Sequence, residues 1–157
     1  MEMNDSQTIA APRQAVWAAI NDPETLRRCI PGCESIERLE NGDLEAIVAL
    51  RIGPVKARFL GSVGFRDMRE PEALTLVGQG NGGIAGHARG EAEVSLQEQE
   101  GGSVTALSYR VHAAVGGKIA QLGARLIDST AQKLAREFFA RLREEVAGSA
   151  ATTAQQQ

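Results

Sequence analysis

The chain has 157 residues, of which 43% are hydrophobic and 24% charged, a length that suits one domain with a substantial core. The net charge of −3 argues against nucleic-acid binding, which requires an excess of basic residues. No apolar run approaches the roughly 18 residues of a membrane-spanning helix, and the acidic N-terminus is unlike a signal peptide. With two cysteines and no export signal, we expect a cytoplasmic protein.

The N-terminal part predicts a weak strand followed by two short helices. The first helix covers residues 11–20, with Pro12 in the first turn, where the missing N–H is not needed. Asp22-Pro23-Glu24 is a typical helix start, with a capping carboxylate, a proline and an acid in the first turn. The second helix therefore covers residues 23–28 and ends at Cys29, before the turn formed by residues 30–32.

From residue 35 to residue 115 the hydrophobic period is two, which is typical of strands with one buried face. Short turns separate the successive strands, for example Gly53-Pro54 and Gly101-Gly102. Connections this short join antiparallel neighbours rather than parallel ones. The segment therefore predicts an antiparallel meander of six or seven strands.

After Gly116-Gly117 the period changes to 3.6 and predicts one helix from Lys118 to Ala147. This helix must lie across the concave face of the sheet, since only that arrangement buries both apolar surfaces. We therefore predict an α+β helix-grip domain over residues 1–147, with a curved antiparallel sheet around a long C-terminal helix. Residues 148–157 have no apolar pattern and are predicted to be a disordered tail.

The two cysteines, Cys29 and Cys33, are separated by Ile-Pro-Gly. This spacing differs from that of thioredoxin-type redox pairs. A zinc site would need two further ligands, and the two histidines, His87 and His112, lie on separate predicted strands. We interpret the segment as a turn shaped by Pro31, with the small cysteines packed beneath it, and expect no metal site.

Residues 78–83, GQGNGG, match the string GxGxxG. In dinucleotide-binding proteins this motif precedes a helix whose N-terminus meets the phosphates. Here a predicted strand follows it, so the segment is interpreted as a glycine-rich, flexible hairpin tip.

The inner face of the predicted sheet carries unusually small side chains. They are Ala46, Ala57, Gly61, Gly78, Gly80, Ala88, Gly90, Ala92 and Ala113. Small residues beneath a helix allow either close helix–sheet contact or a cavity, and a long concave sheet favours the cavity. We predict a ligand-binding cavity without catalytic groups, lined by Val48, Leu50, Phe59, Val63, Leu76, Leu107, Tyr109, Leu122, Leu126 and Thr130.

Four ordered segments resemble the CoxG family of carbon monoxide dehydrogenase proteins, a branch of the START-like (SRPBCC) superfamily. They are VWAAINDPETLRRCIPGCESIE, GPVKARFLGSV, GQGNGGIAGHARGEAEVSL and GGKIAQLGARLIDSTAQKLAREFF, and the resemblance runs from about residue 1 to 145. It implies the helix-grip fold, a hydrophobic cavity, and a CIPGC turn that is structural. It also implies a non-enzymatic accessory protein of a molybdenum hydroxylase complex such as carbon monoxide dehydrogenase, which binds a quinone. Such proteins aid membrane recruitment or electron transfer through peripheral contact at the inner face of the plasma membrane.

Two other functions remain open on the sequence alone. A START-like enzyme or carrier for a polyketide, aromatic or lipid ligand would need a polar group in the cavity. The candidates for that group are Tyr109, Thr105, Thr130 and Ser129. A purely structural assembly factor would instead have a collapsed cavity.

Overall fold

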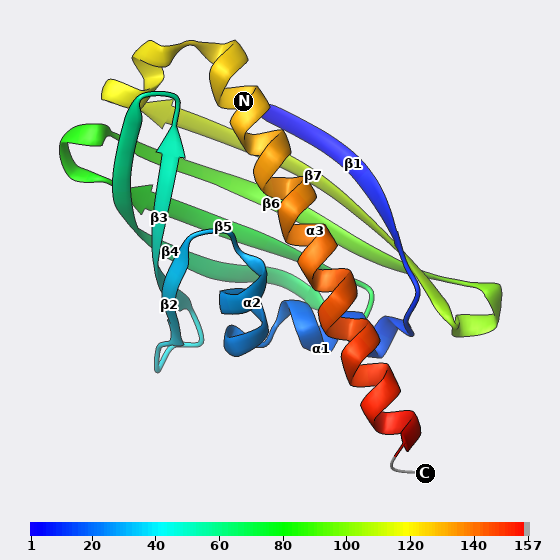
Figure 1. Cartoon of the computed structure of the whole chain (residues 1–157). Coiled ribbons are helices and arrows are strands. Elements are labelled where there is room, and N and C mark those ends of the chain that lie inside the picture. Colours follow the sequence, from blue (N-terminus) through cyan, green and yellow to red (C-terminus); the bar gives the residue numbers. More distant parts are fainter. Residues whose placement is uncertain (156–157) are drawn as a thin grey trace.

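Seven strands form one curved antiparallel sheet around a long C-terminal helix (Figure 1). The computed structural model describes the backbone of residues 1–155 and the side chains of residues 1–147. The elements in chain order are β1 (Glu2–Ile9), α1 (Arg13–Ile20), α2 (Pro23–Cys29), β2 (Cys33–Arg38), β3 (Leu44–Ile52), β4 (Val55–Arg69), β5 (Ala73–Asn81), η1 (Gly83–Ala85), β6 (His87–Gln99), η2 (Glu100–Gly102), β7 (Val104–Gly116), η3 (Lys118–Leu122) and α3 (Ala124–Gln155).

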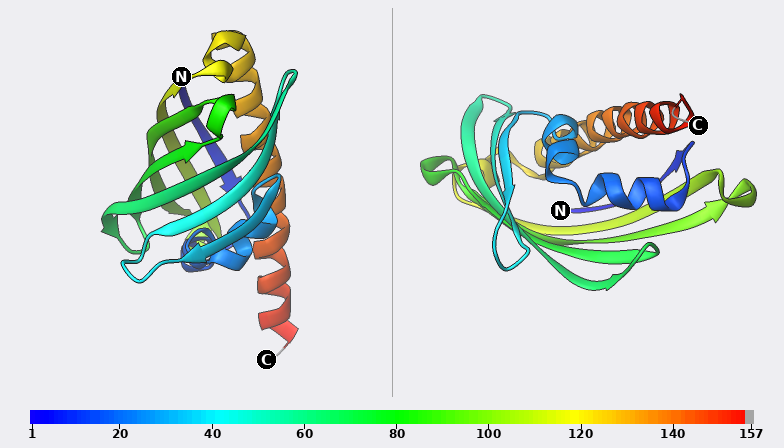
Figure 2. Two further views of the ribbon diagram at one scale, coloured as in Figure 1. Left: turned by 90° about the vertical axis from the view of Figure 1, so that its left-hand side faces the viewer. Right: turned by 90° about the horizontal axis from the view of Figure 1, so that it is seen from below.

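The strand order in the sheet is β1-β7-β6-β5-β4-β3-β2. Strands β2 to β7 therefore follow one another as a meander, and β1 closes the arrangement by pairing with the last strand, β7. All pairs are antiparallel, which confirms the predicted meander and gives it seven strands. The sheet bends around α3, as the two further views show (Figure 2).

The two short helices form where the sequence predicts them. Pro12 occupies the N-cap of α1, and Asp22 caps α2, with its Oδ2 accepting hydrogen bonds from the Thr25 N–H at 3.1 Å and the Thr25 hydroxyl at 2.7 Å. These bonds, the hydroxyl bond most of all, lower the pKa of the Asp22 carboxyl, because they favour its charged form. Both helices lie at one end of the sheet, against the later turns of α3 (Figure 1).

The C-terminal helix differs from the prediction at both ends. Residues 118–122 form the separate 3-10 helix η3, and α3 begins only at Ala124. Gly123 between them has a φ of +96°, in the left-handed region that ends a helix and favours glycine. Helix α3 then continues to Gln155, into the segment predicted as a disordered tail, and residues 156–157 of that segment lie outside the described residues.

A hydrophobic core fills the end of the concave face next to α1 and α2. Its buried members include Trp17, Leu107 and Leu142, with exposed fractions of 5%, 2% and 0%. The buried Thr105 hydroxyl donates a hydrogen bond of 2.7 Å to the Ala11 carbonyl, which satisfies both polar groups inside this core. We call this region the packed end of the concave face.

Candidate functional site

The other end of the concave face holds a cavity of about 580 Å³. It lies between the first turns of α3 and the inner face of strands β3 to β7. Its lining residues are Met3, Ile30, Pro31, Val48, Leu50, Ile52, Phe59, Gly61, Leu76, Gly80, Ala88, Ala92, Val94, Tyr109, Val111, Val115, Ile119, Ile127, Thr130, Ala131, Leu134, Ala135, Phe138 and Phe139. We call this region the open end.

The small residues of the sheet create this space. Gly61, Gly80, Ala88 and Ala92 form its floor on strands β4, β5 and β6. One wall is the buried ring of Phe59, which lies so close to Gly82 that a side chain there would meet it at 2.6 Å. The sequence prediction that a small-residue face leaves a cavity rather than a close helix contact agrees with this arrangement.

The lining carries no charged side chain and only two hydroxyl groups, those of Tyr109 and Thr130. The Thr130 hydroxyl already donates a hydrogen bond of 2.8 Å to the Leu126 carbonyl of its own helix. A cavity of this kind favours an apolar ligand, because a polar or charged ligand would lose its hydration without finding partners.

Six of the ten predicted cavity residues line this space. They are Val48, Leu50, Phe59, Leu76, Tyr109 and Thr130. Val63 lines an adjoining hollow of about 290 Å³ on the same face, whose lining also includes Leu76.

The other three predicted residues lie elsewhere. Leu107 belongs to the packed end, because the helices α1 and α2 cover the sheet at its level. Leu122 packs beside the cavity with Ile119 rather than lining it, and Leu126 lies against Gly53, whose hypothetical Cβ would be 2.7 Å from the Leu126 Cδ2 atom. The break at Gly123 changes the helical phase, so the stripe predicted for one continuous helix does not face the cavity.

A different stripe of α3 covers the cavity instead. Ile127, Leu134 and Phe138 line it, together with Thr130 and Ala131. The sequence contains this stripe at spacings of seven and four residues, the signal of one helix face, but the predicted site did not include it. It also left out Met3, Val94, Val111 and the turn residues Ile30 and Pro31, whose place in the cavity depends on how the chain folds back.

Tyr109 separates the open end from the packed end. Its ring stacks on Phe139 of α3 at a centroid distance of 5.2 Å. Burial is the main reason why the pKa of its hydroxyl is raised, and the nearby Asp5 carboxylate adds to it, whereas a hydrogen bond with the Gln7 side chain acts in the opposite direction. Arg143 of α3 donates a hydrogen bond to the same Gln7 side chain, so this polar group is tied to the edge strand β1.

The CIPGC segment forms the turn from α2 to β2. Gly32 has a φ of +77°, and a Cβ at this position would come within 2.0 Å of the Ala49 carbonyl oxygen, so only glycine fits. Cys29 is fully buried in the core and Cys33, partly buried, begins β2; neither forms a disulfide. Burial raises the pKa of the Cys29 thiol to about 11, which keeps the thiol neutral and poorly nucleophilic at ordinary pH.

The GQGNGG segment is a hairpin tip. Residues 78–81 end β5, η1 follows at Gly83–Ala85, and β6 begins at His87. The Gly83 N–H donates to the Asn81 side chain at 2.8 Å. The strand–turn–strand arrangement confirms the interpretation as a hairpin and gives no helix N-terminus for a phosphate.

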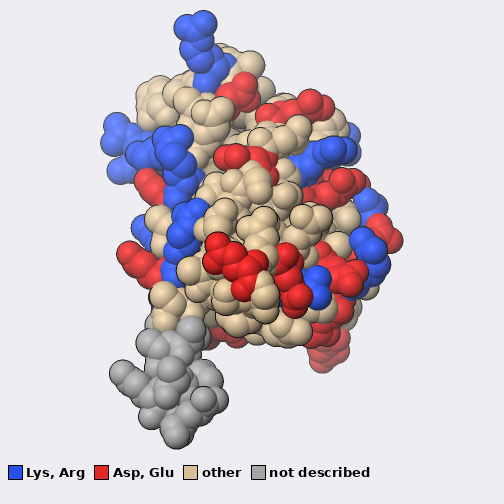
Figure 3. All heavy atoms as spheres, turned by 90° about the vertical axis from the view of Figure 1, so that its right-hand side faces the viewer, with Lys and Arg blue, Asp and Glu red and all other residues tan. Residues whose placement is uncertain are grey.

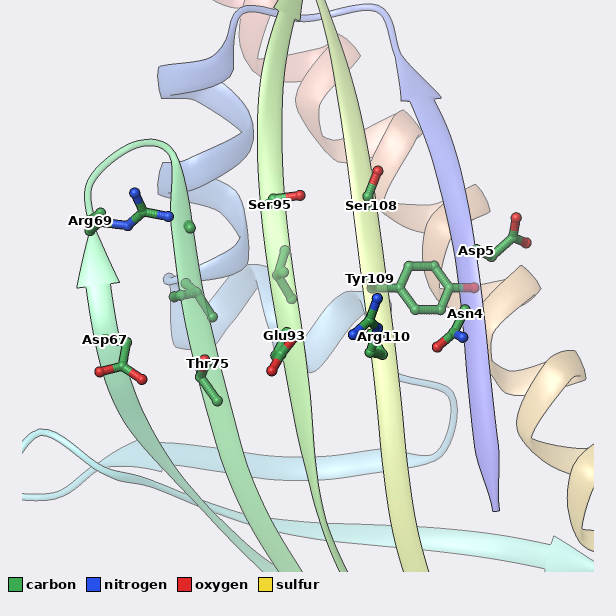
Figure 4. A pocket seen from close by; sticks show the side chains of 13 residues that line it. Asn4, Asp5, Asp67, Arg69, Thr75, Glu93, Ser95, Ser108, Tyr109 and Arg110 are labelled. Carbon is green, nitrogen blue, oxygen red and sulfur yellow. The ribbon is translucent and has the colours of Figure 1, made fainter.

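A polar hollow of about 510 Å³ lies on the outer face of the sheet (Figure 4). Thr75, Glu93, Arg110 and Asn4 face each other across neighbouring strands in one row. The hollow contains charges of both signs on a solvent-exposed face. It is separated from the cavity by the sheet itself.

Two further findings concern the described part of the chain. Among its side chains, no group of three or more His, Cys, Asp or Glu residues is arranged to hold a metal ion. No helix in it combines the length and the hydropathy needed to cross a bilayer.

A long helix gripped by a curved antiparallel sheet, with an apolar cavity beneath it, defines a START-like protein. The carbon monoxide dehydrogenase family CoxG matches residues 6–147. The chain therefore belongs to the CoxG family of carbon monoxide dehydrogenase proteins, as the four sequence segments indicated.

Solved structures support the fold. A conserved protein from Geobacillus kaustophilus is 30% identical, with a TM-score of 0.89 over 95% of this chain and 97% of that one. A START superfamily protein from Mycobacterium smegmatis is 14% identical with a TM-score of 0.69, over 94% of this chain and 97% of that one. The Zhui aromatase/cyclase from a Streptomyces species is 12% identical with a TM-score of 0.68, over 94% of this chain and 93% of that one. No curated protein matches the chain.

Proposed function

We propose that this protein is a non-enzymatic accessory protein of a carbon monoxide dehydrogenase-type molybdenum hydroxylase, and that it binds an apolar ligand, a quinone, beneath α3. The observation that carries the proposal is the cavity of about 580 Å³, whose lining has no charged group. The family to which the chain belongs is named for a component of this enzyme system, which supports the partner. Aid to membrane recruitment or to electron transfer is part of the proposal.

The chemistry of the cavity favours a carrier over an enzyme. General acid–base catalysis needs an ionisable group within hydrogen-bond reach of the substrate, and the lining offers only Tyr109 and the already engaged Thr130. The likeness to an aromatase/cyclase, at 12% identity, concerns the fold alone. A quinone needs only an apolar enclosure for its ring and isoprenoid chain.

The first test is native mass spectrometry of the protein purified from a quinone-containing host, followed by titration with a short-chain ubiquinone or menaquinone. We expect one quinone per chain. The variant Ala88→Phe places a ring on the cavity floor and should reduce binding at least tenfold. Its control, Ala114→Phe, changes an exposed residue on the outer face of the neighbouring strand and should bind as the wild type does.

Two results would contradict the proposal. One is a protein that is purified empty and does not bind added quinone. The other is equal binding by Ala88→Phe and Ala114→Phe, which would place the ligand outside the cavity. Copurification with a hydroxylase tests the partner separately.

A further inference from the structure

The charges of the chain are divided between the two ends of the sheet. Residues 47–60, 79–90 and 114–127 contain six Lys and Arg and no Asp or Glu, whereas the rest of the chain contains 11 Lys and Arg against 20 Asp and Glu. The register joins these three segments in one row across the sheet, through Leu60, Asn81, His87 and Gly116. We call the three segments together the basic end.

The basic charges of this end are free of acidic neighbours. Arg58 forms an ion pair with Glu34 at 3.0 Å. Arg51, Lys56, Arg89, Lys118 and Arg125 form no ion pair within the residues whose side chains the structure describes. In a side view, Lys and Arg cover the upper left edge of the molecule, and large groups of Asp and Glu lie in its lower half (Figure 3).

The same end presents an isoleucine to the solvent. Ile84, at the tip of the hairpin between β5 and β6, is 94% exposed. Its neighbour Ala85 is buried against Phe59 and Ile119, which holds the tip in place while Ile84 points away from the protein. A second apolar side chain, Leu60, is 53% exposed and lies opposite Asn81, the last residue of β5 before this tip.

The basic end also borders the cavity. Ile52, Phe59 and Ile119 belong to it and line the cavity. A ligand that leaves the cavity at this end therefore passes between an exposed isoleucine and unpaired basic side chains.

We propose that the basic end, with Ile84 at its tip, docks on the surface of an anionic lipid bilayer. Basic side chains near such a surface are attracted to its negative potential, and a single exposed apolar side chain inserts among the headgroups without needing a complementary pocket. An acidic protein surface would match the charge but not the isolated apolar tip. The inference rests on the proposed function, because it supplies the place where a membrane-soluble quinone passes between bilayer and cavity.

The test is flotation of the full chain with vesicles of equal parts phosphatidylglycerol and phosphatidylcholine, and with vesicles of phosphatidylcholine alone. We expect binding to the anionic vesicles that weakens when salt is raised from about 50 to about 300 mM, because salt screens the attraction. Ile84→Ser should lower the affinity roughly tenfold. The double variant Lys56→Gln/Lys118→Gln should lower it roughly 30-fold.

Matched controls come from the other end of the molecule. Met68, 49% exposed, lies near the far end of β4, and Met68→Ser should bind as the wild type does. Arg27→Gln/Arg69→Gln removes two positive charges from α2 and from that far end, and should also have little effect.

Absence of binding to anionic vesicles would overturn the proposal, and so would equal losses in the test and control variants. Capture of the hydroxylase that depends on Ile84, without vesicle binding, would assign the basic end to a protein partner and also overturn it. Quinone titration of the same variants in detergent separates the two proposals. If the quinone binds and vesicles do not, only the docking surface is wrong; if vesicles bind and no quinone does, only the proposed ligand is wrong.

Discussion

The two ends of the concave face differ in what fills them, although one sheet and one helix run through both. At the packed end, large side chains such as Trp17, Leu107 and Leu142 meet beneath α1 and α2. At the open end, α3 alone spans the sheet above Gly80 and Ala88, and a cavity of about 580 Å³ remains. Stability and ligand binding are thereby assigned to different ends, because a space that is to receive a ligand contributes no packing of its own.

The largest expected effect comes from equal truncations of α3 at the two ends. Leu142→Ala removes a side chain with 0% exposure from the packed end and should lower the free energy of unfolding by about 2–5 kcal/mol. Leu134→Ala, two turns earlier, removes a side chain that already borders empty space, and should cost about 1 kcal/mol. Urea unfolding of both variants tests the difference. Equal losses would mean that the open end is as tightly packed as the other.

Enlarging an alanine should have the opposite consequences at the two ends. Ala11 is 1% exposed in the packed end, so Ala11→Phe overfills the core and should cost about 3 kcal/mol. Ala88→Phe enters the cavity and should change stability by less than about 1 kcal/mol while it blocks quinone binding. The measurement is urea unfolding beside quinone titration. A large loss of stability in Ala88→Phe would show that this floor has no free space.

A smaller effect should appear as a pH dependence of the packed end. Burial raises the pKa of the Cys29 thiol to about 11, whereas an unfolded chain has a thiol of ordinary pKa. Below the unfolded pKa both states are protonated; above it the unfolded state loses its proton first. Stability should therefore fall as pH rises from about 9 to about 11, by about 2.5 kcal/mol at most.

The control for this titration is Cys29→Ala, which should remove that part of the pH dependence in urea unfolding. Cys33→Ala, at the partly buried cysteine of the same turn, should retain it. A wild type and a Cys29→Ala variant with parallel pH profiles would show that the thiol is not shielded from water.

Much of the fold follows from local sequence patterns. Alternation of apolar residues determined the strands, and the short glycine and proline turns between them made the sheet antiparallel. Asp22 and Pro23 defined the start of α2. The small side chains of the inner face, Ala88 and Gly80 among them, indicated the space beneath the helix. These features depend on neighbours in the chain, which the sequence displays directly.

The site itself depended on the tertiary structure. The sequence by itself determined the elements, the family and the apolar character of the cavity. Only the folded chain decided that α1 and α2 cover Leu107, that Gly123 with its φ of +96° rotates the stripe of α3, and that Ile30 and Pro31 reach the cavity wall. The reason is that a change of helical phase or the placement of one helix end selects which residues meet across the core, and those residues are far apart in the sequence.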